Sequence, residues 1–255
     1  MKNIIYILFT ILIIISSCKN DDETTTETFG TVVLDFKNTI KTNGIELITD
    51  LYTNSSNEIY NISELKYIIS NVVLIKANGE EFTYPLDRSY FLVNEEVLDS
   101  KKIKLSDIKT GEYTKIRFGI GVDQSKYPLN GMANFIPTAE ENAMLWSWSA
   151  GYIFLKFEGS YTTSGGTNTD FLIHIGSHGT TLDNYKQITL DLPETLVIQE
   201  SESPEIAINV DVEKIFDGPN THSLEQKNSI QVDPEFSPKI AENIGDMFNA
   251  VSISN

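Results

Sequence analysis

The chain has one cysteine, at position 18, and three histidines among its 255 residues. One cysteine excludes a disulfide-stabilised scaffold and a cysteine-rich zinc centre, and three histidines limit the imidazole ligands available to any metal site. Basic residues are also scarce, since 19 Lys and Arg stand against 36 Asp and Glu for a net charge of −17. An acidic surface of this kind repels phosphate backbones, so nucleic-acid binding is not expected.

Nucleotide-binding and nucleophile motifs are also missing. The sequence has no GxxxxGK[ST] loop, no GxGxxG fingerprint, no GxSxG elbow and no HExxH signature. Acidic residues are plentiful, but nothing in their spacing singles out the pair of carboxylates that a glycosidase needs. We therefore expect a protein that is not an enzyme. An extracytoplasmic hydrolase is the least supported alternative.

The N-terminal residues have the features of a targeting signal. Lys2 precedes an apolar run from Ile4 to Ile15, which is shorter than the roughly 20 residues that a membrane-spanning helix needs. Small residues follow the run, so residues 1–17 predict a secretory signal peptide. Ile15-Ser16-Ser17-Cys18 resembles the lipobox of bacterial lipoproteins, in which the cysteine carries lipid. A buried thiol behind an ordinary signal peptide is the alternative for Cys18.

Residues 18–30 are polar, acidic and threonine-rich, and they predict a flexible tether ahead of a single domain over residues 31–255. The stretch from Lys19 to Glu23 resembles the export tag of Bacteroidetes surface lipoproteins, with a solvated charge run as the alternative. We therefore expect an outer-membrane lipoprotein, held to the membrane by its lipid anchor, on the periplasmic face or at the cell surface.

Short strand-like segments dominate from Thr31 onward, separated by turn residues at intervals of about ten residues. This pattern predicts an all-β domain, an antiparallel β-sandwich. A capping-box pattern from Thr138 to Glu141 predicts a short helix before the tryptophans. Apolar residues at helical spacing predict a C-terminal amphipathic helix from Pro238 to about Val251.

Both tryptophans of the chain, Trp146 and Trp148, lie two residues apart. On a strand they would share one face and form an aromatic patch, which either packs into the core or serves a function. His174 lies in a strand-like run, His178 follows it in a glycine-flanked turn, and His222 lies in a loop. A strand and a turn can bring two imidazoles to one ion, while a hydrogen-bonded or solvated histidine is the alternative at each position.

Calcium is a further candidate ligand of the chain. The stretch from Asp211 to Asn220 is rich in Asp and Asn and contains turn residues. Carboxylate and carbonyl oxygens at such turns suit a structural calcium ion, although the stretch lacks the spacing of an EF-hand loop.

Taken together, the tryptophan and histidine motifs resemble those of the MbnP-like family of methanobactin-associated periplasmic copper-binding proteins, whose Bacteroidetes branch consists of small lipoproteins. The motif reads Met144-x-Trp146-x-Trp148-x-x-Gly151-Tyr152-x-Phe154-x-x-x-Glu158-Gly159, followed by Phe171-x-x-His174-x-Gly176. The resemblance implies a β-sandwich that binds copper through histidine and through a tryptophan oxidised to kynurenine by a dihaem cytochrome c peroxidase-like enzyme.

By position, the resemblance makes Trp146 or Trp148 the modified residue and His174 a ligand. The chain departs from the family pattern between Val122 and Tyr127, where relatives carry a histidine and this chain has none. A second imidazole would therefore come from His178 or His222. The sequence as a whole indicates a lipid-anchored, copper-binding β-sandwich that does not catalyse a reaction. The alternative is a metal-free surface binding or assembly module on the same fold.

Overall fold

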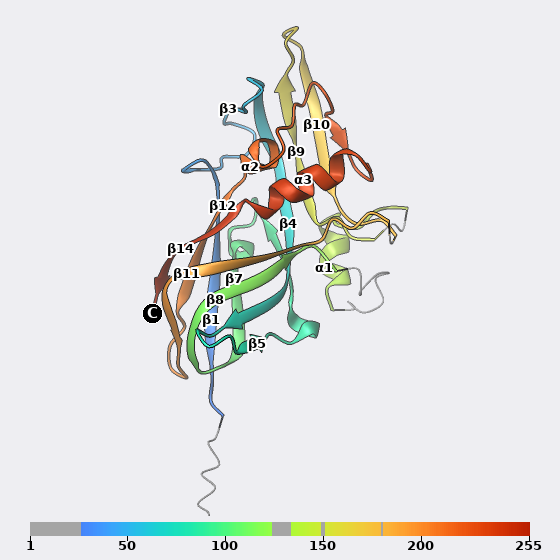
Figure 1. Ribbon diagram of the computed structural model, residues 1–255. Coiled ribbons are helices and arrows are strands. Elements are labelled where there is room, and N and C mark those ends of the chain that lie inside the picture. Colours follow the sequence, from blue (N-terminus) through green and yellow to red (C-terminus); the bar gives the residue numbers. More distant parts are fainter. Residues whose placement is uncertain (1–26, 124–133, 149–150, 180) are drawn as a thin grey trace, which may run out of the picture.

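The computed structural model describes residues 27–123, 134–148, 151–179 and 181–255 (Figure 1). The predicted signal peptide, Cys18 as the predicted site of lipid attachment, most of the predicted tether and most of the histidine-free stretch before Tyr127 lie outside these ranges. Within the ranges, the helices are too short or too polar to cross a bilayer.

Two β-sheets make up the domain, which confirms the predicted sandwich-like all-β fold. The smaller sheet has the order β14-β12-β1-β2, with β7 also paired to β1. The larger sheet has the order β11-β8-β4-β9-β10-β13, and β3, β5 and β6 pair with the long strand β4. The strands are β1 (Phe29–Ile40), β2 (Asn43–Gly44), β3 (Tyr52–Thr53), β4 (Ile59–Ile75), β5 (Glu81–Thr83), β6 (Tyr90–Asn94), β7 (Lys102–Lys109), β8 (Gly111–Ile120), β9 (Leu155–Thr162), β10 (Asn168–Ile175), β11 (Lys186–Ile198), β12 (Glu205–Asp211), β13 (Ser229–Ile230) and β14 (Phe248–Ser254).

Most neighbouring strands are antiparallel, as expected, but two pairs are parallel. Strand β12 runs parallel to β1, and β13 runs parallel to β10. Parallel neighbours need a long crossover connection, and the chain between β1 and β12 contains nearly all of the larger sheet. The alternation of side chains along a strand is the same in both directions, so the sequence pattern could not show which pairs would be parallel.

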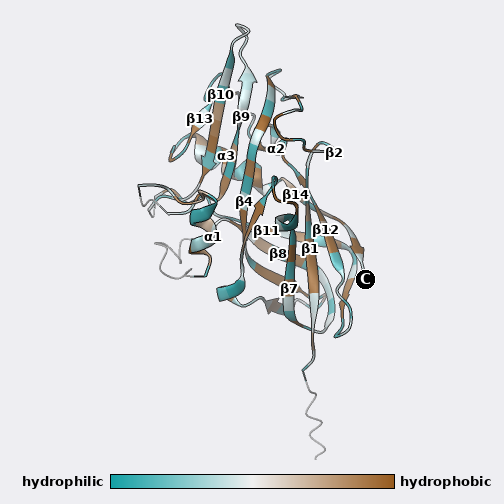
Figure 2. Ribbon diagram, turned by 180° about the vertical axis from the view of Figure 1, so that it is seen from behind, coloured by the Kyte–Doolittle hydropathy of each residue, from teal (hydrophilic) through white to brown (hydrophobic). Residues whose placement is uncertain are grey.

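The main core lies between the two sheets. Figure 2 shows hydrophobic stretches along β1, β4 and β12, interrupted by hydrophilic residues, and buried residues alternate with less buried ones over Phe29–Leu34 of β1, which places one face of this stretch toward the core. Four aromatic rings, those of Phe36, Tyr67, Phe118 and Phe248, meet there edge-to-face with centroids 5.4 to 6.4 Å apart. Burying each such side chain stabilises the fold by about 1.5–3 kcal/mol.

The helices are few and short. The α-helices are α1 (Ile136–Glu141), α2 (Lys214–Asp217) and α3 (Phe236–Gly245), and the 3₁₀ helices are η1 (Leu86–Arg88) and η2 (Leu98–Lys101). The predicted capping box at Thr138 is wrong: α1 begins earlier, after Phe135, and no side chain caps it. Pro137 lies in the first turn, where its fixed φ favours the helix and its missing N–H costs nothing, so the helix starts before Thr138.

The C-terminal helix is shorter than predicted. Helix α3 ends at Gly245, and the expected continuation to Val251 is instead strand β14. β14 pairs with β12 over the register Val210↔Phe248 to Glu205↔Ser254. An open strand edge thus decided the structure of residues whose apolar spacing also fitted a helix.

Candidate metal centre on the outer face of the larger sheet

The segment that contains the tryptophans packs on the outer face of the larger sheet, away from the main core. It forms a second, smaller apolar cluster made of Ile68, Tyr90, Val122, Phe135, Ala139, Met144, Trp146, Tyr152, Ile153 and Phe154. A bridge between Leu145 and Tyr152 closes the segment on itself. The backbone N–H of Phe154 then donates to the carbonyl of Ile175, 2.6 Å away, and ties the segment to the end of β10.

The two indole rings stack on each other, with centroids 4.8 Å apart and an interplanar angle of 29°. Trp146 is 5% exposed, whereas Trp148 is 51% exposed. The buried Nε1–H of Trp146 has no hydrogen-bond partner among the described residues. An unsatisfied buried donor costs about 1–3 kcal/mol, so burying Nε1 of Trp146 here lowers the stability of the fold.

Gly176 allows the tryptophan segment to come this close to β10. A Cβ atom at this position would lie 2.4 Å from the carbonyl oxygen of Tyr152 and 3.2 Å from Nε1 of Trp146. The backbone oxygen cannot move aside without displacing the segment. The glycine of the motif is therefore needed for packing of the segment against the strand.

His174 lies on β10 beside this aromatic pair. Its ring centroid is 5.9 Å from that of Trp146, and its Nε2 is 2.7 Å from Oε1 of Glu158 on the neighbouring strand β9. Burial lowers the pKa of His174, and the hydrogen bond to Glu158 does not offset that effect. The ring is therefore neutral near pH 7. With Nε2–H donating to the carboxylate, Nδ1 carries the lone pair, and metal-binding histidines are commonly held in this way by a carboxylate that accepts from their other ring nitrogen.

A row of alternating charges on β9 and β4 supports Glu158. Lys156 lies 3.5 Å from Glu158 and 2.9 Å from Glu64, and Glu64 lies 2.6 Å from Lys66. Burial acts to raise the pKa of Glu64, but the hydrogen bonds from Lys66 and Lys156 outweigh it and lower that pKa. The two ammonium groups thus hold the carboxylates in place and leave His174 with an anchored partner.

His178 lies near the tryptophans but in a different setting. It is exposed, and its backbone N–H donates to the carbonyl of Leu182 at 2.9 Å. His178 and Trp148 line one open groove of about 520 Å³, together with the ion pair of Lys227 and Asp233 at 3.5 Å. The structure therefore places this imidazole beside the exposed tryptophan, in a groove that His174 does not line.

His222 lies elsewhere, where its Nε2 is hydrogen-bonded and its ring is packed against aromatic side chains. Its Nε2–H donates to the carbonyl of Lys227 at 2.8 Å, and its ring stacks on Phe216 with a centroid distance of 6.1 Å and an angle of 19°. Phe236 meets the ring edge-on at 5.8 Å. These contacts describe a core histidine that holds the loop before β13.

Conventional metal ligands do not converge in the described part of the chain. No three His, Cys, Asp or Glu side chains there are placed to share an ion. In the proposed calcium turn, Asp211 accepts a hydrogen bond from the backbone of Lys41 and Asp217 accepts two from Ser55. Around the tryptophans, the rings of His174 and Trp146 are in contact, with centroids 5.9 Å apart, and Nε1 of Trp146 has no partner among the described residues, so a metal site here would be built on these two residues.

Sequence reasoning named Trp146, Trp148 and His174, and the structure brings these three together. It did not assign roles to Glu158 or Gly176, although both stand in the motif quoted above. Glu158 and His174 lie on adjacent antiparallel strands whose register pairs Leu172 with Glu158. A carboxylate and an imidazole two residues out of register on paired strands are the signal that would have linked them.

Comparisons with known proteins agree with this fold. The sequence matches the family model for MbnP over residues 29–233. The structure is similar to that of MbnP from Methylosinus trichosporium, with a TM-score of 0.53 and 10% sequence identity, over 89% of this chain and 99% of that one. At this identity the likeness shows the fold alone, and no curated protein matches the sequence. Because the family model covers well over half of the chain, the protein belongs to the MbnP family.

Proposed function

We propose that the protein is a lipid-anchored extracytoplasmic copper-binding protein that captures or handles copper without catalysing a reaction. Membership of the MbnP family points to a copper-related role. The observation that carries the proposal is His174, whose Nε2 is held by Glu158 at 2.7 Å, next to the buried indole nitrogen of Trp146, which has no partner among the described residues. Imidazole and neutral nitrogen donors suit copper.

The ring of Trp146 would have to change before it could bind a metal. An indole N–H is a donor only and has no lone pair to offer. In the proposed conversion, the peroxidase-like partner supplies the oxidising equivalents of two hydrogen peroxide molecules, the indole C2–C3 bond is cleaved with an oxygen atom added to each carbon, and hydrolysis releases C2 as formate. The product, kynurenine, carries an aniline amine that can act as a ligand beside His174. We assign Trp146 this role because it is the tryptophan in contact with His174. Trp148, half exposed and stacked on it, gives a dihaem cytochrome c peroxidase-like partner a surface to approach.

A Cu(I) titration of the mature protein against a competing chelator tests the site. We expect one copper per chain, with an affinity at least roughly 100-fold weaker in His174→Gln. His178→Gln is the matched control, because it removes an exposed imidazole that lies beside Trp148 in a groove that His174 does not line. Equal affinities of wild type and His174→Gln would reject the assignment.

The anchor and the modification have separate tests. Cys18→Ser is expected to release the protein from the membrane fraction, and a variant that stays there would contradict the lipid anchor. Peptide mass mapping of protein from its native host should find kynurenine at position 146. Unmodified tryptophan at both positions would remove the second copper ligand.

The alternative is a metal-free surface binding module. It is favoured by the open groove in which Trp148 exposes half of its ring beside Lys227 and Asp233, a setting suited to stacking a sugar or another flat ligand. In that case Trp148→Ala would abolish binding to a polysaccharide array, and copper would not bind stoichiometrically.

A further inference from the structure

One row of side chains along β1 faces the main core, and a single amide interrupts it. The row consists of Val32, Leu34, Phe36, Asn38 and Ile40, each of which is 7% exposed or less. Burying the amide of Asn38 costs free energy that its hydrogen bonds only offset, whereas an apolar side chain would avoid that cost. The amide therefore calls for an explanation other than packing.

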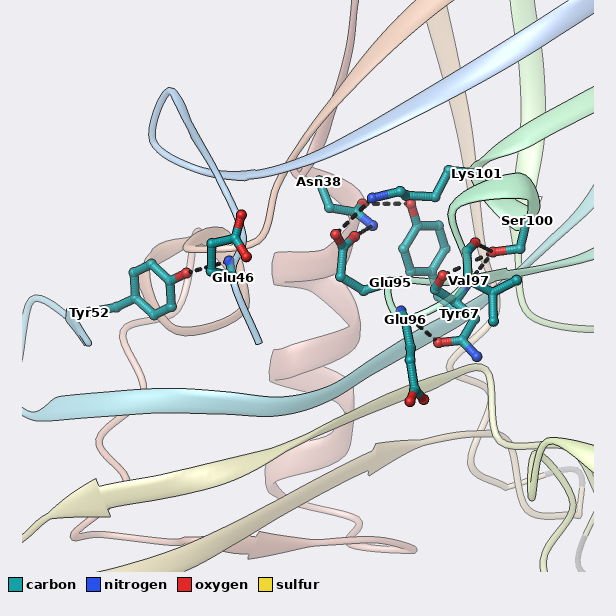
Figure 3. A network of polar contacts seen from close by, with 10 residues as sticks. Asn38, Glu46, Tyr52, Tyr67, Glu95, Glu96, Val97, Ser100 and Lys101 are labelled. Carbon is teal, nitrogen blue, oxygen red and sulfur yellow. Dashed lines mark hydrogen bonds and ion pairs between the residues drawn. The ribbon is translucent and has the colours of Figure 1, made fainter. Parts of the chain in front are cut away.

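Three polar side chains join Asn38 in one hydrogen-bonded network (Figure 3). The phenol of Tyr67 donates to Oδ1 of Asn38 at 2.8 Å, and Nδ2 of Asn38 donates to Oε2 of Glu95 at 2.7 Å. Nζ of Lys101 donates to Oε1 of the same carboxylate, also at 2.7 Å. A single carboxylate thus holds an amine and an amide at its two oxygens.

The four side chains of this network come from both sheets. Asn38 lies on β1 of the smaller sheet, and Lys101 ends η2 immediately before β7, which pairs with β1. Tyr67 lies on β4 of the larger sheet, and Glu95 directly follows β6. The backbone N–H of Glu95 donates to the carbonyl of Leu65 at 3.0 Å and so holds the carboxylate against β4. The network is therefore complete only when the two sheets have packed together.

Water has little access to the network. Tyr67 is fully buried, and the side chains of Glu95 and Lys101 are 7% and 18% exposed. Removing an ammonium and a carboxylate from water costs about as much as their attraction returns. Transfer of one proton along the bond from Nζ to Oε1 removes both charges and leaves an amine beside a carboxylic acid. The amine is a nucleophile, whereas the ammonium is not.

We propose that Lys101 and Asn38 join in an intramolecular isopeptide bond, an amide between Nζ and Cγ, with Glu95 as the catalytic residue. The three groups are those that such a reaction needs, namely an amine, a primary amide and an acid that can pass a proton between them. Because one carboxylate holds both reactants, the bimolecular reaction becomes an intramolecular one.

The bond would form in one exchange. Nζ, after passing a proton to Glu95, attacks Cγ of Asn38, while the phenol of Tyr67 donates to the negative charge that develops on Oδ1. The carboxylic acid of Glu95 protonates Nδ2, and the carboxylate that results takes a second proton from Nζ. The Cγ–Nδ2 bond breaks as the Nζ–Cγ bond is completed, and one ammonia molecule is released. No atom changes its oxidation state, so the reaction needs no oxidant or cofactor.

The released ammonia has a route to solvent. A groove of about 640 Å³ borders the network, and Asn38, Glu95 and Lys101 are among the residues that line it. Escape of ammonia through this groove makes the exchange irreversible.

Such a bond would give this chain what a disulfide gives other proteins. The chain has one cysteine and cannot form a disulfide within itself. An isopeptide bond would close residues 38–101 into a loop and reduce the conformational freedom of the unfolded chain. The reaction occurs once in each molecule, and it is independent of the copper site, so the two proposals stand or fall separately.

Peptide mapping of the denatured mature protein by mass spectrometry tests the bond. Trypsin should release residues 38–41 joined to residues 89–102, with no cleavage after Lys101. The joined peptide should be lighter than its two parts together by one ammonia, about 17 Da.

Two variants and a control identify the reacting groups. Lys101→Arg keeps a cation opposite Glu95 but removes the amine, and Glu95→Gln keeps the shape of the side chain but cannot pass the proton. Both should lose the joined peptide. Lys102→Arg is the matched control, because the neighbouring Lys102 pairs with Glu205 at 2.7 Å instead, and it should keep the joined peptide.

Three outcomes would overturn the proposal. Recovery of residues 38–41 as a free peptide from the wild-type protein would overturn it whatever the variants show, including variants that fail to fold. A joined peptide that persists in Lys101→Arg would mean that a different residue supplies the amine. A joined peptide that forms to the same extent in Glu95→Gln would mean that Glu95 does not catalyse the reaction.

Discussion

His174 and His222 are buried to nearly the same extent, at 7% and 4% exposure, yet their surroundings differ in kind. His222 donates to a backbone carbonyl and is enclosed by Phe216 and Phe236. His174 donates to a carboxylate that is held by a row of ion pairs, and it lies beside an indole with an unsatisfied N–H. The contacts of His222 complete an aromatic core. The surroundings of His174 include a buried N–H donor, Nε1 of Trp146, that has no partner among the described residues.

The difference teaches that burial does not separate a structural histidine from a candidate ligand. The partner of the bonded nitrogen is more informative. Either a backbone carbonyl or a carboxylate fixes the direction of the ring, but a carboxylate also makes the opposite nitrogen more basic. Mutations in the two regions should therefore have separable effects, on the free energy of unfolding near His222 and on copper affinity near His174.

The largest expected effect is on stability in the His222 region. Phe216 is fully buried and its ring meets Tyr60, Phe157 and Phe171 at 5.1 to 5.9 Å, besides stacking on His222. Phe216→Ala should lower the free energy of unfolding by about 3–5 kcal/mol through the cavity it leaves. Denaturant unfolding measures this. Copper affinity of the folded protein should not change, and a parallel loss of copper binding would mean that the two regions are coupled.

The next largest effect is expected at Gly176. Gly176→Ala would place a methyl group against the Tyr152 carbonyl and the Trp146 indole, which should cost about 1–3 kcal/mol of stability through overpacking. It should also weaken copper binding, because the tryptophan segment must move away from His174. Thermal unfolding and a copper titration of the same sample check both effects, and full copper affinity with lowered stability would contradict the proposed role of Trp146.

A smaller effect is expected when Glu158 is replaced. Glu158→Ala removes the partner of His174 Nε2 and should weaken copper binding by about 10–100-fold. Glu158→Gln keeps an oxygen acceptor for Nε2–H without the charge, so it should recover part of that loss. If the two variants bind copper equally well, the hydrogen bond does not position the imidazole.

The smallest effect concerns pH, and both regions contribute to it, because burial lowers the pKa of His174 as well as that of His222. Burial lowers the pKa of His222 in the folded protein, so the unfolded chain takes up a proton first, near the ordinary value of about 6.5. The free energy of unfolding should therefore be at its full value above about pH 6.5 and should fall as the pH drops below it. His222→Gln should have a shallower slope there in urea unfolding. An unchanged slope would show that His222 does not contribute to it.

Local patterns were enough to predict much of this fold. The alternation of apolar residues located the strands, and the pairing of two tryptophans with His174 located the candidate site. The end of α3 could not be predicted, because Met247, Phe248 and Val251 fit a helix and a strand equally well and the free edge of β12 decided between them. The bond from His174 to Glu158 was also beyond the sequence, because it depends on the register between β9 and β10, which no local pattern encodes.

The exposure of Trp148 is a further feature that the spacing of residues could not reveal. Strand-like alternation predicts that both tryptophans share one environment, but the segment turns after Trp146 and leaves the second ring in solvent. The difference between the two rings follows from how the segment docks on β10, which requires a glycine at position 176.

The central claim is that copper binds at His174 and not at His222. Crystals of the copper-loaded protein, with anomalous diffraction recorded on both sides of the copper absorption edge, test it most directly. The account predicts a single copper peak bonded to Nδ1 of His174 and bordering the side chain at position 146. A peak at His222, or copper only at exposed carboxylates with His174 still bound solely to Glu158, would contradict it.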